Sequence, residues 1–454
     1  MRDNSKDRNS RLVEHVQATA QMHPERIAIV QIAVEGAPVS VSYGELAQSI
    51  SERAEELSHS AEEADNNIHI ISEYEGAEFL VEYLAVQATG GVAVLCAEPL
   101  GYAMPTLPSD TANVLYTSGT TGRRKGVAIS HRTIEANVQN LLSSQPYTEA
   151  TTFIICGGMD HLGCLSKVWA TLSVGGTLVL LRDGLKDVNA LFRALDWSDG
   201  NAGRRFATFL VPGAIRMLLR FSKARLALYS ERIAFIETGA DALSSADMLS
   251  LRQTLPHSRL FNTYASTEGG IVATYDFSQG DCREGCVGKA LKNSTIGITG
   301  DGRIVCGGDT VMSGYVNEEG FSPSHGKIVT NDNGRTDAEG NLYITGRTDD
   351  IINVSGYKVS PVEVENTALE IEFITECLCL PAEHPVLGKV LRLLYVANVA
   401  FGNSEKEQNR FIAKHLNKKL EHYKVPMYYK KVDKIARTAT GKPDRKSYAN
   451  KYVL

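Results

Sequence analysis

The residues best suited to chemistry lie together near position 120. A strand-like apolar stretch leads into six small or hydroxylated residues, which are Thr117, Ser118, Gly119, Thr120, Thr121 and Gly122. Three cations follow, and the last of them is Lys125. Glycines let backbone N–H groups turn toward an anion, while hydroxyl and ammonium groups add donors and positive charge. The segment therefore predicts a phosphate-binding loop without the spacing of a Walker A motif. A plain hairpin is the alternative, but a hairpin needs only two turn residues.

Two segments further along the chain carry side chains that suit a nucleotide. Tyr264 offers a flat face to a purine, Thr267 a hydroxyl to a phosphate, and Glu268 a hard oxygen ligand to Mg²⁺. Asp332 can accept hydrogen bonds from ribose hydroxyls, and Arg347 presents a planar fork to ribose or phosphate. Solvated turns are the alternative for both segments, and an Asx-turn would explain Asp332 without a ligand.

Taken in order, the loop and these segments resemble the motifs of the adenylate-forming superfamily. That family includes acyl-CoA synthetases, peptide-synthetase adenylation domains and luciferases. Besides the loop, the matching segments are NTYASTE (262–268), VTNDNGRTDAEGNLYITGRTDD (329–350), IINVSGYKVSPVEVE (351–365) and RTATGKPDR (437–445). Because the matches keep the family's order over most of the chain, the sequence is identified as a member of it.

The resemblance implies a role for each matching residue. Beyond the phosphate loop, the nucleotide contacts would be Gly239, Ala240, Asn262, Thr263, Tyr264, Asp332 and Arg347. Thr267, Glu268 and Lys442 would act in catalysis, with Glu268 on Mg²⁺ and Lys442 as the adenylation lysine. Gly356 would leave room for the pantetheine arm of coenzyme A.

His161 is the candidate for the wall of the acyl pocket. A core or surface histidine is the alternative. The neighbouring Asp160 keeps an amino-acid substrate open, since an Asp in this region binds the substrate amine in amino-acid adenylation domains.

The sequence departs from the family pattern at several points. Ala265 and Asn331 stand where Gly is usual, and Asn353 replaces a Lys. The extra methyl of Ala265 would narrow the acyl pocket, and Asn tolerates the left-handed conformation. The part before residue 117 is shorter than usual, as though a βα portion were trimmed, which puts dimerisation and the outer pocket wall in question.

Composition is that of a globular chain with an uneven charge. The 454 residues are 43% hydrophobic and 22% charged, and the formal net charge is −6. This excludes a disordered chain and disfavours a nucleic-acid binder. The formal net charge of residues 401–454 is +9, and that of the rest of the chain is −15. The simpler interpretation of the basic tail is a solvated face, and the alternative is a contact with a phosphate-rich ligand. The polar N-terminus, the lack of an apolar span and unpaired cysteines favour a cytoplasmic protein in a reducing compartment.

Alternating strand and helix patterns predict the fold class. Short apolar strands separated by amphipathic helices over the first 300 residues predict layered α/β sheets with much parallel pairing. Gly-rich strand-like pieces after residue 285 predict a small antiparallel β region. We expect an N-terminal AMP-binding domain at 1–346, trimmed before the phosphate loop, and a small mobile α+β domain at 347–454 with a hinge near Asp349.

These observations predict an ATP- and Mg²⁺-dependent ligase that joins a carboxylic acid to coenzyme A through an acyl-adenylate. A loader of acyl or aminoacyl groups onto a phosphopantetheinyl carrier protein is one alternative. A non-catalytic nucleotide sensor is another, although a sensor has no need of Lys442.

Overall fold

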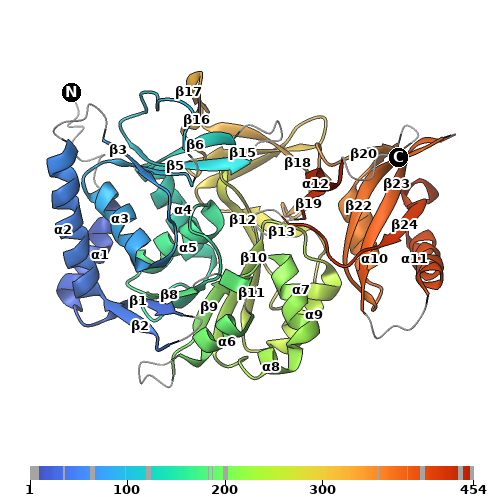
Figure 1. Cartoon of the computed structure of the whole chain (residues 1–454), viewed down its shortest axis with the longest axis horizontal. Helices are drawn as coiled ribbons and strands as arrows, with labels where there is room; N and C mark the ends of the chain where they lie inside the picture. The colour runs from blue at the N-terminus through green and yellow to red at the C-terminus, as the bar shows by residue number, and fades with distance from the viewer. Residues whose placement is uncertain are drawn as a thin grey trace.

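The computed structural model of the chain is a layered α/β body followed by a small α+β unit (Figure 1), which confirms the predicted fold class. It describes residues 10–33, 36–61, 67–97, 99–118, 124–181, 184–186, 188–197, 203–354, 357–385, 387–398, 404–437 and 443–449.

One large sheet runs through the body. Its strands lie in the order β14-β15-β18-β19-β13-β12-β11-β10-β9-β7-β8-β1-β2. The strands from β11 to β1 are all parallel. At the outer end of this half, β2 (Val39–Ser42) pairs antiparallel with β1. The parallel strands are β1 (Ile27–Ile32), β7 (Thr152–Ile155), β8 (Thr177–Leu181), β9 (Phe206–Phe209), β10 (Ile233–Gly239) and β11 (Arg259–Ser266). Their carboxyl ends therefore meet at one edge, where ligands bind in open α/β sheets.

The other half of this sheet is antiparallel. It consists of β12 (Gly270–Asp276), β13 (Cys286–Ala290), β14 (Ser294–Ile298), β15 (Arg303–Gly308), β18 (Lys327–Thr336) and β19 (Leu342–Arg347). The antiparallel region predicted after residue 285 is thus present, but as an extension of the parallel sheet.

A second sheet carries the predicted phosphate loop. Its order is β17-β16-β6-β5-β4-β3, with β3 (Ile68–Ile71), β4 (Val92–Leu95), β5 (Thr111–Ser118), β6 (Arg124–Ser130), β16 (Gly314–Asn317) and β17 (Gly320–Pro323). The strand-like pieces after residue 285 do not all join one region, because β16 pairs with β6 of this second sheet. This pairing brings a segment 190 residues later in the chain beside the phosphate loop.

Alternating side chains on the large sheet bury a layer of helices on each face. On β7, Phe153 and Ile155 join a core that reaches the second sheet, whereas Ile154 joins a core on the opposite face. The first core includes helices α1 (Arg11–Met22), α2 (Tyr43–Ala61), α3 (Gly76–Ala88), α4 (His131–Ser144) and α5 (Leu162–Ser173). The second core includes α6 (Val188–Asp196), α7 (Pro212–Phe221), α8 (Lys223–Ala227) and α9 (Ser245–Thr254), with the short helix η2 (Gly184–Lys186) beside them (Figure 1).

The short connection between β4 and β5 covers the outer face of the second sheet. Leu100, Tyr102, Met104 and Leu107 pack on Val94 and its neighbours there. A stretch of irregular chain thus buries the apolar surface at the place where the sequence predicts a trimmed βα portion.

The C-terminal unit has its own apolar core, which begins at Ile352. Its elements are β20 (Ile352–Val354), β21 (Tyr357–Val359), α10 (Pro361–Leu369), β22 (Ile374–His384), β23 (Gly388–Ala397), α11 (Glu405–Lys419), η3 (His422–Lys424), β24 (Tyr428–Lys431) and α12 (Arg445–Ala449). Pro361 occupies the first turn of α10, where proline is favoured because its missing N–H would have no partner there. Within the described ranges, no helix is long and apolar enough to cross a membrane.

Candidate functional site

A cavity of about 1050 Å³ opens at the carboxyl ends of the parallel strands. Its wall is built from residues at or just after the ends of β1, β7, β8 and β9, and from residues 72–78 after β3. His161 lines it, and its role at the wall of an acyl pocket stays a prediction. Phe209, at the end of β9, lies at the side of the cavity nearest to β10, since its ring is 3.7 Å from the Cβ position of Gly239.

His161 is held by the adjacent carboxylate. Its Nδ1 lies 2.8 Å from Asp160 Oδ1, at the N-terminal end of α5. Burial works against the charged ring, but the hydrogen bonds to Asp160 and Cys164 outweigh it and raise the pKa of His161 to about 10. The ring is therefore a cation at neutral pH, and Asp160 is occupied by it.

A buried ion pair ties this wall to the next strand. Lys167 of α5 donates to Glu237 of β10 at 2.8 Å, and both side chains are 1% exposed. Removing either partner would leave a buried unpaired charge and lower the free energy of unfolding by about 3–5 kcal/mol. The pair thus fixes the helix that carries His161 to the strand that ends at Gly239.

The turn after β10 holds a backbone strain. Ala240 has φ +69°, a left-handed conformation that costs a non-glycine residue roughly 1–2 kcal/mol. Gly239 comes so close to β11 that a Cβ would lie 2.5 Å from the Thr263 carbonyl oxygen. The turn at Gly239 and Ala240, predicted to contact the nucleotide, is therefore shaped by tight β10–β11 packing, and backbone strain of this kind is common at ligand sites.

The NTYASTE segment forms the end of β11 and the turn that follows. Asn262 and Thr263 are buried, and the Asn262 amide donates to the Cys286 carbonyl at 2.8 Å. The Thr263 hydroxyl lies 3.1 Å from that of Thr274 on β12. In this structure both side chains hold neighbouring strands together, so any contact with a nucleotide would come from their backbone.

Tyr264, Asp332 and Arg347 form one hydrogen-bonded group. The Tyr264 hydroxyl donates to Asp332 Oδ2 at 2.7 Å, and Arg347 Nη1 donates to Asp332 Oδ1 at 3.0 Å. The Arg347 fork also donates twice to Asp349, at 3.0 Å each. Only 8% of Tyr264 is exposed, and burial together with the Asp332 charge raises its pKa. A carboxylate has about four acceptor sites, so Asp332 keeps capacity for ribose hydroxyls.

Glu268 meets the phosphate-loop hairpin through a residue that the sequence did not mark. The Tyr315 hydroxyl donates to Glu268 Oε1 at 3.4 Å, and the Lys125 ammonium lies 5.4 Å from the Tyr315 ring centroid. Burial and Glu268 raise the pKa of Tyr315 to about 12, so it stays a donor at neutral pH. Its position in β16 explains why only the strand pairing, and no local motif, could reveal it.

Several predicted site residues lie outside the described ranges, namely Gly119, Thr120, Thr121, Gly122, Gly356 and Lys442. The loop at 119–123 joins β5 to β6, where Thr117 pairs with Lys125 and Ser118 with Arg124. Thr117 and Thr267 are partly exposed beside these elements.

The segment around Lys442 is anchored at both sides. The Arg445 guanidinium makes a bidentate ion pair with Glu365 of α10, with Nη1 2.6 Å from Oε1 and Nη2 2.8 Å from Oε2. It also donates to the Cys379 carbonyl. On the other side, Arg437 pairs with Glu376 and bridges to Pro443. A Cβ on Gly213 of α7 would lie 3.0 Å from Arg437, so this segment is packed against the body. The sequence marked Arg445 only as context for the lysine.

The donor set suits Mg²⁺ bound together with phosphates. Among the described residues no group of three or more His, Cys, Asp or Glu could hold a metal. Mg²⁺ is commonly bound by one or two carboxylates plus substrate phosphates. Glu268, partly exposed and bound by Tyr315, whose ring lies 5.4 Å from the Lys125 ammonium, fits that arrangement.

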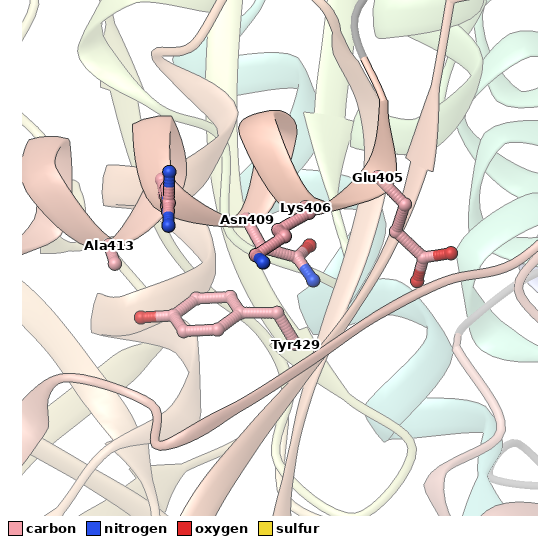
Figure 2. Close-up of a pocket in the computed structure, with 6 residues that line it drawn as sticks. Glu405, Lys406, Asn409, Ala413 and Tyr429 are labelled. Atoms are coloured by element: carbon pink, nitrogen blue, oxygen red, sulfur yellow. The ribbon is translucent and has the colours of Figure 1, made fainter.

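A second hollow lies on the C-terminal unit, apart from these residues (Figure 2). It measures about 530 Å³ and is bounded by α11 and β24, with Lys406, Asn409 and Tyr429 among its lining side chains. None of the described site residues lines it. Lys406 and Arg410 are exposed there, which agrees with the predicted basic face of the tail.

Two family models match the chain. The model of the AMP-binding enzymes matches residues 98–316, and that of the AMP-binding enzyme C-terminal domain matches residues 363–442. Together they span about two thirds of the chain. The chain belongs to the AMP-binding enzymes of the adenylate-forming superfamily, which confirms the family that its motifs predict.

Relatives within this family differ in length and chemistry. The chain is 25% identical over 405 residues to bacitracin synthase 3 of Bacillus licheniformis, covering 84% of this chain and 6% of that protein. It is 29% identical over 369 residues to 4-coumarate--CoA ligase-like 8 of Arabidopsis thaliana, covering 77% of this chain and 64% of that protein. The chain thus spans less than two thirds of the length of either relative.

The fold agrees with solved structures. ATP-bound MatB from Rhodopseudomonas palustris superposes with a TM-score of 0.81 at 20% identity, over 98% of this chain and all of that chain. At this identity the likeness establishes the fold.

Proposed function

We propose that the chain activates a carboxylic acid with ATP to an acyl-adenylate and then transfers the acyl group to the thiol of coenzyme A. The observation that supports it best is the continuity of the strand edge. Phe209 lines the cavity and lies 3.7 Å from where a Cβ on Gly239 would stand, and the next strand, β11, ends at Ser266, just before Thr267 and Glu268. An acid in the cavity and a nucleotide on β10 and β11 would be neighbours.

In the first step the carboxylate attacks the α-phosphorus in line and pyrophosphate leaves. The carboxylate is already ionised, so the protein needs no base and contributes position and charge. The loop at 117–125 would hold the β- and γ-phosphates, Asp332 and Arg347 the ribose, and Lys442 the reacting oxygens. Glu268 would hold Mg²⁺, which neutralises phosphate charge when bound.

In the second step a thiol attacks the acyl carbonyl and AMP leaves. We expect the C-terminal unit to turn about Asp349 between the steps, so that the loop at Gly356 replaces Lys442. The fork from Arg347 to Asp349 lies at the start of this unit and would be the contact that changes.

The test is a pyrophosphate-release assay with a panel of fatty, aryl and amino acids, followed by a comparison of acceptors. Coenzyme A should give a free thioester, and removing either ATP or the acid should abolish pyrophosphate release. Failure with every acid, while ATP still binds, would leave a nucleotide sensor instead.

Loading of a carrier protein is the second candidate. It is favoured by the similarity to bacitracin synthase 3 and by Asp160, whose carboxylate contacts the cavity-lining His161. Aminoacyl-adenylate formation, together with transfer to a phosphopantetheinyl carrier and none to coenzyme A, would establish it.

A further inference from the structure

Helix α7 belongs both to the wall of the cavity and to the boundary between the two units. Val211, its N-cap residue, and Ala214, in its first turn, line the cavity. Gly213, Arg216 and Arg220 follow one another at spacings of three and four residues, which places them on one face of the helix. Figure 1 shows α7 on the side of the body next to the C-terminal unit. The helix therefore borders both the cavity and the unit that would turn between the two steps.

Arg220 connects this helix face to the C-terminal unit through a two-pronged contact. Its Nη1 donates to the Ile374 carbonyl and its Nη2 donates to the Glu372 carbonyl, each at 2.8 Å. Both acceptors belong to the chain that leads from α10 into β22. The planar guanidinium presents two parallel donors, so it fixes the direction as well as the distance of the contact.

The Arg220 contact is of a kind that can open and close. Arg220 is partly exposed, and both of its acceptors are neutral backbone carbonyls. When the C-terminal unit moves away, water can bind the guanidinium and the carbonyls, so no buried charge is left unpaired. This differs from the bidentate pair of Arg445 with Glu365, which lies within the C-terminal unit and would move with it.

The same face of α7 contacts the segment that leads into Lys442. Arg437 lies against the helix, since a Cβ on Gly213 would be 3.0 Å from its Nη1. Arg437 also pairs with Glu376 near the start of β22 and forms a backbone bridge with Pro443. Lys442 stands between Arg437 and Pro443 in the chain. In the arrangement seen here, α7 therefore lies beside the segment of the adenylation lysine at one end and lines the cavity with its first turn.

We propose that Arg220 is a positioning residue for adenylation, because its two hydrogen bonds hold the C-terminal unit where Lys442 can reach the reacting oxygens. This role rests on the proposed function, in which the unit turns between the steps. Arg220 is not among the residues that line the cavity, so it acts through docking of the unit and touches no substrate. Losing it should lower the fraction of docked chains and leave the acid site intact.

The first test measures docking on the whole chain in the absence of any substrate. Trypsin cleavage after Arg347, at the start of the C-terminal unit, is followed by mass spectrometry in the wild type and in Arg220→Gln. Cleavage that requires opening follows the population of the open form, so we expect Arg220→Gln to be cut there about tenfold faster. Arg220→Lys, which keeps one donor group, should be intermediate. Arg225→Gln is the matched control, because Arg225 binds Asn189 within the body, and it should be cut at the wild-type rate.

The second test separates the two half-reactions, with the acid that gives the most pyrophosphate in the wild type. Arg220→Gln should lower kcat for pyrophosphate release about tenfold and leave KM for the acid unchanged, since fewer chains are docked at any moment. Thioester formation from synthetic acyl-adenylate and coenzyme A should keep at least its wild-type rate. A residue that only stabilised the fold would slow both half-reactions together.

Each outcome decides the proposal. Wild-type cleavage of folded Arg220→Gln and Arg220→Lys would overturn it, as would equal losses in both half-reactions or a loss confined to thioester formation. If the wild type releases pyrophosphate with no acid while Arg220→Gln is still cut faster, the ligase function fails and the role in adenylation fails with it, but the docking contact stands. The cleavage test needs neither ATP nor an acid, so the two failures can be told apart.

Discussion

The ribose contact assigned to Asp332 can be tested by Asp332→Asn. The carboxylate is 16% exposed and accepts hydrogen bonds from Tyr264 at 2.7 Å and Arg347 at 3.0 Å. The substitution keeps the shape but removes the charge and one acceptor. A hydrogen bond to a charged group is worth about 1.5–3 kcal/mol. Losing one ribose contact should therefore weaken ATP binding about ten- to 150-fold.

Titration calorimetry of the whole chain with ATP and Mg²⁺, in the absence of any acid, measures this directly. Asp337→Asn is the matched control, since Asp337 lies on the same β18–β19 hairpin and binds Asn341. It should bind ATP like the wild type. If Asp332→Asn also binds ATP like the wild type while remaining folded, the ribose assignment is wrong.

Four further changes test separate parts of the site. Ala240→Gly should raise the free energy of unfolding in urea by about 0.5–1 kcal/mol, because it relieves the strain at φ +69° while Gly adds freedom to the unfolded chain. Arg445→Met should lower it by about 3–5 kcal/mol, since it leaves Glu365 unpaired, and adding Glu365→Gln should restore part of the loss. Glu268→Gln should raise the Mg²⁺ concentration needed for half-maximal adenylation without unfolding the chain; an unchanged Mg²⁺ requirement would count against the metal assignment. Lys442→Ala should slow adenylation about 10²–10³-fold yet leave thioester formation from synthetic acyl-adenylate unchanged, whereas equal losses would mean a structural role.

Local sequence patterns were sufficient to predict individual helices and strands but not which strands pair with one another. The helical spacing of apolar residues after Leu12 corresponds to α1, and the apolar run after Arg26 corresponds to β1. Both could be recognised because the spacing of buried side chains along a helix or strand is visible in consecutive residues. The pairing of β16 with β6 is decided by packing between segments far apart in the chain. No window of sequence around residue 315 contains that information.

The site shows the same limit. The motif marks Asp332 and Arg347 by residue type and spacing, and the structure brings the two together at 3.0 Å, while their contact with ribose stays a prediction. Tyr315 and Arg445 could not be predicted from the sequence. Tyr315 binds Glu268 and Arg445 binds Glu365, and each pair is far apart in the chain and meets only in the folded structure. A lone tyrosine in a strand, or one arginine in a basic tail, carries no local signal.

The placement of Asp241 bears on how the two units cooperate. It follows the strained Ala240 at the end of β10, and its negative charge contributes to the raised pKa of Asp350, after the larger effect of burial. Asp350 in turn lies 3.8 Å from Arg445, which anchors the segment after Lys442. Asp241 and Arg445 thus both act on Asp350, at the boundary between the units. If the C-terminal unit turns between half-reactions, the Arg445 cation must leave this acidic neighbourhood.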